Sequence, residues 1–272
     1  MRSLILIALM ACQVNTWANS ANNCFSKGQL SFGMVPIVSS SLIDLWSSNI
    51  NRQIQKPQCR KLRFTSSTDF KHYIKKAKEG KFDVLAAPAH IASYLINTEK
   101  FKPVAFLVWE SSYLYVVKNE SHISAIDHKD AQRFALPDAV SEASILAQAE
   151  TQRPNEDIAY YQHYKQIVQA VVNKKADIGV VLLPFYKAYK KRTKMKVRAI
   201  HETPFPSHGM IIAAPHTSEQ DQQYLFEALA ALDAESGLFW QKFDAISPVE
   251  LKKFHQQQTP SVHTLKQLLQ QN

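Results

Sequence analysis

Long apolar runs are missing from most of this chain of 272 residues. Beyond residues 1–18, no stretch is long and apolar enough for a transmembrane helix. Low-complexity tracts and short-period repeats are also absent. What is present is an ordinary globular composition, with 46% hydrophobic and 20% charged residues. The length is sufficient for one large domain or for two modest domains.

Motifs of catalysis, metal binding and nucleic-acid binding are absent as well. The sequence contains neither G-x-S-x-G nor H-E-x-x-H, and its ten histidines lack metal-ligand spacing. The net charge is +9, but the basic residues are scattered, and the densest run, 187–198, fits a solvated helix end and loop. We therefore predict no catalytic residue, no metal, no cofactor and no nucleic-acid partner, and we expect a protein that is not an enzyme.

The first 18 residues have the pattern of a signal peptide. Arg2 supplies the positive start, residues 4–11 are apolar, and residues 16–18 offer a cleavage site before Asn19. This pattern predicts export to the periplasm. The alternative is a lipoprotein signal, in which Cys12 would carry a lipid anchor, although its apolar segment would then be very short.

Cysteine is scarce, with three residues in the whole chain. Cys12 would leave with the signal peptide, so Cys24 and Cys59 would remain in the exported protein. An even pair outside the cytoplasm suggests a disulfide, which would contribute about 3–4 kcal/mol. Two free buried thiols or a metal pair are the alternatives, and the metal pair lacks a nearby histidine.

Short apolar segments alternate with helical patterns, and this alternation predicts an α/β fold with mostly parallel sheets. The predicted strands are 30–36, 62–66, 82–86, 104–109, 113–118, 133–136, 158–161, 176–182, 197–202 and 209–213. The predicted helices are 41–55, 69–78, 90–96, 144–150, 164–173, 184–191, 224–232 and 235–243, and the tail from Ser247 is expected to be helical, polar and loosely held.

Two such series, one nested inside the other, predict two lobes. Lobe 1 would comprise residues 19–111 and 206–272, the latter with the helical tail, and lobe 2 residues 112–205. Ligands of open α/β sheets bind beyond the carboxyl ends of the strands. The expected binding site is therefore the cleft between the lobes.

Several segments in this order resemble the periplasmic phosphate/phosphite/phosphonate-binding family of type II solute-binding proteins. They are LSFGMVP (30–36), FTSSTDFKHY (64–73), KEGKFDV (78–84), the loop 134–141, IVQAVVNKKADI (167–178) and PFP (204–206). The resemblance covers about residues 28–245. It implies a monomer that captures a small-molecule ligand, anionic or less charged, for an ABC transporter permease, and that closes about a hinge.

The same resemblance draws attention to a departure from the family pattern. Ser and Thr of the lobe 2 loop hold the phosphonate in the family, and here Ala139 and Val140 take two of their positions. Ser141 is retained, and the next residue is the acidic Glu142. Because this clamp is mostly missing, a membrane sensor as partner, an interaction module without a ligand, and an enzyme on the same fold are the alternatives to transport.

Nine residues are predicted to line the ligand site from their places after strands or at crossovers. They are Ser39, Ser40, Ser67, Thr68, His90, Tyr113, Ser141, Phe185 and His208. Each also has a structural interpretation. The hydroxyl residues are typical helix caps, with the cap of the helix 69–78 expected near Thr68. His90, Tyr113 and Phe185 also fit core positions, since a lone histidine is more often structural and an aromatic after a strand more often packs in the core.

Overall fold

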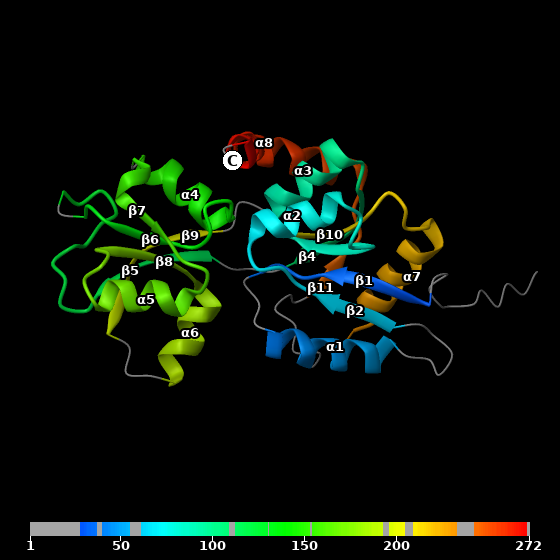
Figure 1. Ribbon diagram of the computed structural model, residues 1–272, viewed down its shortest axis with the longest axis horizontal. Coiled ribbons are helices and arrows are strands. Elements are labelled where there is room, and N and C mark those ends of the chain that lie inside the picture. The colour runs from blue at the N-terminus through cyan, green and yellow to red at the C-terminus, as the bar shows by residue number, and fades with distance from the viewer. Residues whose placement is uncertain are drawn as a thin grey trace, which may run out of the picture.

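The computed structural model describes residues 28–36, 40–54, 61–108, 112–129, 131–152, 154–192, 196–204, 209–232 and 242–270. Figure 1 shows two α/β lobes side by side, each with a central sheet between layers of helices. The predicted two-lobed type II fold is confirmed, although both sheets are mixed and not mostly parallel. The predicted signal peptide, Cys12 and the pair Cys24 and Cys59 lie outside the described residues.

Lobe 1 contains a six-stranded sheet in the order β11-β4-β10-β3-β1-β2. Its strands are β1 (Gln29–Gly33), β2 (Lys61–Thr65), β3 (Val84–Ala87), β4 (Lys102–Val108), β10 (Gly209–Ala213) and β11 (Lys242–Asp244). Its helices are α1 (Ser40–Ile54), α2 (Phe70–Lys78), α3 (Ala89–Glu99), α7 (Glu219–Ala230) and α8 (Pro248–Gln270). β1 runs parallel to β2 and β3, and β10 runs antiparallel to β3 and β4.

Lobe 2 contains a five-stranded sheet in the order β7-β6-β8-β5-β9. Its strands are β5 (Ser112–Lys118), β6 (Phe134–Leu136), β7 (Ile158–Tyr160), β8 (Ile178–Leu182) and β9 (Val197–Pro204). Its helices are α4 (Glu142–Thr151), α5 (Tyr164–Val172) and α6 (Leu183–Arg192), with a short 3₁₀ helix at Asn155–Asp157. β6 runs parallel to β7 and β8, and β5 runs antiparallel to β8 and β9.

Side-chain alternation along the strands builds a core on each face of each sheet. In β5, Tyr113 and Tyr115 pack on the face covered by α4, and Leu114 and Val116 pack on the face covered by α5. A strand that is buried on both faces has to be apolar throughout. This explains why β5 and β8 have continuous apolar sequences.

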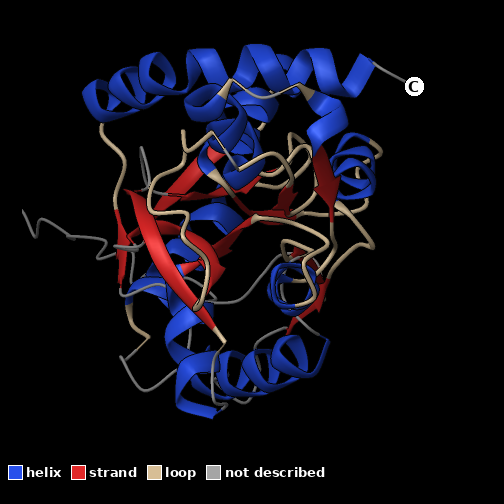
Figure 2. Cartoon of the chain, turned by 90° about the vertical axis from the view of Figure 1, so that its left-hand side faces the viewer, coloured by secondary structure: helices blue, strands red, loops and turns tan. Residues whose placement is uncertain are grey.

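The C-terminal tail differs from the sequence-based prediction. Residues 248–270 form one continuous helix, α8, which lies along lobe 1 beside α3 and also contacts α4 of lobe 2. Figure 2 shows its length across one side of the molecule. Phe254 and Leu265 are buried in the same core as Val140 and Ile145 of lobe 2. The tail is therefore packed against both lobes, and the prediction of a loosely held end was wrong.

Two other predictions need correction. The helix predicted for 235–243 falls largely outside the described residues, and its last positions belong to strand β11 instead. The cap of α2 is Asp69, whose Oδ1 accepts a hydrogen bond of 2.7 Å from His72 N, and not Thr68. Asp outranks Thr as an N-cap, and the Thr68 hydroxyl donates to the Asp69 carboxylate instead.

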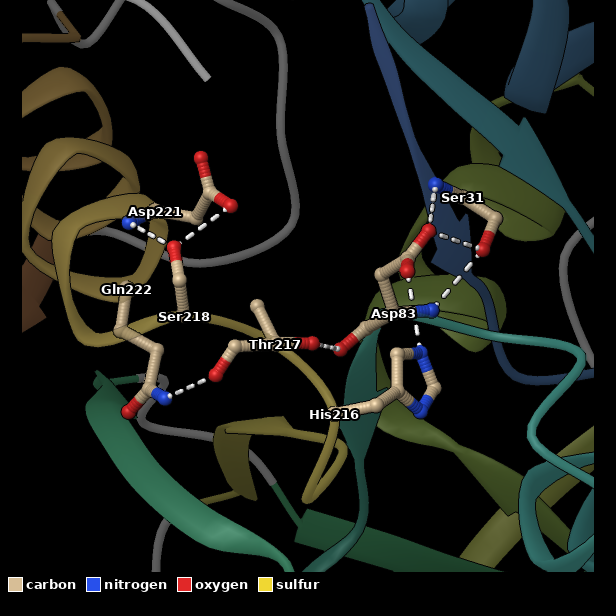
Figure 3. Close-up of polar contacts among 7 residues, drawn as sticks. All are labelled: Ser31, Asp83, His216, Thr217, Ser218, Asp221 and Gln222. Atoms are coloured by element: carbon tan, nitrogen blue, oxygen red, sulfur yellow. Dashed lines mark hydrogen bonds and ion pairs between the residues drawn. The ribbon is translucent and has the colours of Figure 1, made fainter. Parts of the chain in front are cut away.

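Asp83, directly before β3, links β1 to the segment that follows β10 (Figure 3). Its Oδ2 accepts hydrogen bonds of 2.8 Å from the main-chain N and the hydroxyl of Ser31. Its Oδ1 lies 3.0 Å from His216 Nε2. Asp177 occupies the equivalent place before β8 and accepts from the main-chain N of Arg133 at 2.9 Å. An aspartate thus fixes the strand entry in both lobes.

Candidate functional site

The carboxyl ends of the parallel strands in the two lobes lead to segments that meet. β2 leads to the start of α2, β3 to the start of α3, and β6 to the loop before α4. Between the described residues of the two lobes, two hydrogen bonds cross the junction. His90 Nε2 lies 2.9 Å from the main-chain oxygen of Val140, and Phe70 N donates to Asp138 Oδ2 at 3.1 Å. The junction is therefore built at the place where the fold predicts a ligand site.

His90 is the lobe 1 side chain that contacts lobe 2 most directly. It is fully buried in the first turn of α3. A carbonyl oxygen only accepts hydrogen bonds, so Nε2 carries the proton and Nδ1 is the acceptor. Among the described residues, Nδ1 has no hydrogen-bond partner. Burial lowers the pKa of His90 to about 4, which keeps the imidazole neutral at physiological pH.

Glu142 provides the charge-bearing group on the lobe 2 side. It is 5% exposed in the first turn of α4, and its Oε2 accepts a hydrogen bond of 3.4 Å from the Tyr113 hydroxyl. Its Oε1 has no partner within the described part of the chain. Burial raises the pKa of Glu142 to about 7. The carboxyl group is thus poised between its neutral and charged forms near neutral pH.

The two serines after β2 differ in whether their hydroxyl group has a hydrogen-bond partner. Ser66 donates to the main-chain oxygen of Met34 at 2.9 Å, which ties the end of β2 to the end of β1. The Ser67 hydroxyl is buried and has no partner among the residues that the structure describes. Thr68 is exposed and is engaged with Asp69 and with His72 Nδ1 at 3.3 Å. Of the two predicted residues here, Ser67 retains an unused hydroxyl.

Ser141 and Phe185, two more of the predicted site residues, have partners within lobe 2. Ser141 is the N-cap of α4 and hydrogen-bonds with Ser144. Phe185 packs between Tyr164 and Tyr189, with ring centroids 5.4 and 5.5 Å away. Ser40 begins α1, although its side chain is not described, and Ser39 and His208 lie outside the described residues.

Three residues at the junction are absent from the predicted set. Asp138 receives the hydrogen bond from Phe70, Glu142 holds an unused oxygen, and Tyr164 lies close enough to Glu142 for the two to interact electrostatically. The sequence contained one clue to two of them, namely their place after a strand: Asp138 follows the end of β6, and Tyr164 follows β7. Glu142 was noted only as a departure from a family pattern.

No group of three or more His, Cys, Asp or Glu residues in the described part of the chain is arranged to hold a metal ion. Within the same residues, no helix combines the length and hydropathy that a membrane span requires.

Solved structures with the same fold cover nearly the whole chain. A binding-protein component of an ABC phosphonate transporter from Pseudomonas aeruginosa is 15% identical, with a TM-score of 0.69 over 90% of this chain and 96% of that one. PhnD1 from Prochlorococcus marinus, solved with methylphosphonate, is 12% identical, with a TM-score of 0.66 over 85% and 97%. An ancestral arginine-binding protein is 16% identical, with a TM-score of 0.54 over 86% and 99%.

The sequence itself gives a more specific result than the fold. No curated protein matches the chain with significant similarity. The profile of one family, described as the periplasmic substrate-binding protein of the ABC phosphonate transporter, matches residues 32–253. Because this match spans most of the chain, the protein belongs to the family of periplasmic substrate-binding proteins of ABC phosphonate transporters.

Proposed function

We propose that this protein captures a small solute at the junction between its lobes and delivers it to the permease of an ABC importer. The observation that carries the proposal is the set of unused polar atoms at the junction. Ser67 Oγ, His90 Nδ1 and Glu142 Oε1 are buried and have no hydrogen-bond partner among the described residues. Buried polar groups are nearly always paired, so atoms of this kind suit a ligand that supplies the missing partners.

The hydrogen bonds across the junction support a closing motion. His90 and Phe70 of lobe 1 bond to Val140 and Asp138 of lobe 2, and each bond requires the lobes to be together. A ligand that contacts both lobes would stabilise this arrangement over one in which the lobes are apart. Capture by closure needs no chemical conversion of the solute.

A thermal-shift screen of residues 19–272 tests the proposal. The panel contains phosphate, methylphosphonate, sulfonates, amino acids, amines and nucleosides. A ligand at about 100 times its Kd should stabilise the folded protein by about 2.7 kcal/mol. Solution scattering on each hit should show a smaller radius of gyration with ligand than without. If the protein melts cooperatively and no solute in the panel raises its melting temperature, the result would contradict solute capture and favour an interaction module.

A further inference from the structure

The buried acid Glu142 lies among aromatic side chains at one edge of the lobe 2 sheet. Tyr113 is the second residue of β5, Tyr164 begins α5 after β7, and Phe185 is in the first turn of α6 after β8. β5 is antiparallel to β8 and pairs Tyr113 with Leu182, so the start of β5 and the end of β8 share an edge. This edge is also where α4 begins and where lobe 1 makes contact.

Contacts connect the four residues. The Tyr113 hydroxyl donates to Glu142 Oε2 at 3.4 Å, and the Tyr164 and Phe185 rings are 5.4 Å apart. All three aromatic residues belong to or pack against the same buried cluster. Tyr164 and Phe185 are only partly buried, so part of their surface remains open to a ligand.

Within the described residues, no cation offsets the charge of Glu142. In the part of the chain that the structure describes, Glu142 has no ion pair with a lysine, arginine or histidine, and the hydroxyl of Tyr113 is its hydrogen-bond partner. An isolated carboxylate is costly to bury, and a bound cation would remove that cost. Aromatic faces attract cations through their negative quadrupole, and groups of aromatic side chains recognise quaternary ammonium ligands in this way.

We propose that the lobe 2 half of the site binds an ammonium group, with Glu142 as its counter-ion and Tyr113, Tyr164 and Phe185 as its walls. The ligand class is thus a small organic amine or methylated ammonium compound. This inference rests on the proposed function, because it names the ligand of the same site. A phosphonate dianion without an ammonium group would meet the Glu142 carboxylate at this place and should bind there more weakly than an ammonium group, because the two charges are alike.

Calorimetric titration with four small probes tests the inference. Choline and ethanolamine carry the ammonium group, 3,3-dimethyl-1-butanol is the neutral isostere of choline, and methylphosphonate is an anion. The wild-type protein is expected to bind at least one ammonium probe more tightly than both the neutral isostere and the anion. Glu142→Gln, which keeps the shape and removes the charge, should weaken ammonium binding by roughly ten- to a hundredfold.

Two further variants separate recognition from folding. Glu156→Gln removes an exposed acid of the same lobe and should leave ammonium binding unchanged. Tyr164→Leu should weaken choline binding while leaving that of the neutral isostere nearly constant. Circular dichroism establishes that each variant is folded before titration.

The outcomes distinguish this inference from the proposed function. Methylphosphonate binding to wild type without ammonium binding would overturn the ammonium site and leave solute capture standing. Equal ammonium affinity in wild type and Glu142→Gln would also overturn it. Absence of binding by every probe here and by every solute of the thermal-shift panel would overturn both proposals.

Discussion

His90 Nε2 donates a hydrogen bond of 2.9 Å to the main-chain oxygen of Val140, and this bond joins the first turn of α3 to the loop that begins α4. Both residues are fully buried. The two lobes thus share a hydrogen bond from which water is excluded. The loss of either partner would leave the other without a partner in an apolar surrounding.

Replacement of His90 by leucine should therefore weaken the junction. His90→Leu keeps most of the volume but removes the donor, so the Val140 oxygen remains buried and unpaired. We expect a loss of about 1–3 kcal/mol in the free energy of unfolding, measured with urea. The radius of gyration in solution scattering should also increase. His90→Gln retains a donor and should restore part of both quantities, whereas wild-type values in His90→Leu would contradict this role.

Glu142 makes the free energy of unfolding depend on pH, and its contribution decreases as the pH rises. Burial raises its pKa to about 7 from the ordinary value of 4.5, so the folded state holds its proton more tightly than the unfolded state. The associated stability is fully present below the unfolded pKa and is lost as pH rises through about 7. His90 acts oppositely, because burial lowers its pKa to about 4 from 6.5, and its contribution grows as pH rises across that range.

A comparison of wild type with Glu142→Gln isolates the first of these effects. The glutamine does not titrate, so the two proteins should be close in stability near pH 4.5. By pH 7.5 the variant should be the more stable one, by on the order of 2–3 kcal/mol. Urea unfolding across this range measures the difference, and His90 contributes equally to both proteins. A stability difference that stays constant with pH would show that Glu142 titrates normally.

The lobes, sheets and most helices follow from local patterns, because each element depends mainly on its own residues. The continuous apolar sequence of β5, for example, predicts a strand buried on both faces. The junction could not be predicted in the same way, because His90 and Val140 become neighbours only when two lobes meet. The packing of α8 was missed because two of its buried residues, Gln258 and Ser261, are polar and conceal its apolar face.

Asp83 should matter for stability and not for binding. Its carboxylate accepts hydrogen bonds from Ser31 and lies 3.0 Å from His216 Nε2, at the end of β3 opposite to the junction (Figure 3). Asp83→Asn places an amide donor against these donors and should cost about 1–3 kcal/mol in urea unfolding. Asp44→Asn changes the same charge on the exposed surface of α1 and is the matched control. Altered affinity for an identified ligand in Asp83→Asn, at unchanged stability, would contradict this assignment.

The C-terminal helix offers a test of how firmly α8 is held. Leu265 is fully buried in the core that also contains Val140 and Ile145 of lobe 2, whereas Val249, near the start of α8, is 78% exposed. Leu265→Ala should lower the free energy of unfolding by about 2–5 kcal/mol, because it removes buried methyl groups and leaves a cavity. Val249→Ala should change it by less than about 0.5 kcal/mol. If both variants unfold at the wild-type urea concentration, α8 does not contribute to the core in solution. If only Leu265→Ala is destabilised, the end of the helix that carries Leu265 is an integral part of the core that lobe 1 shares with Val140 and Ile145.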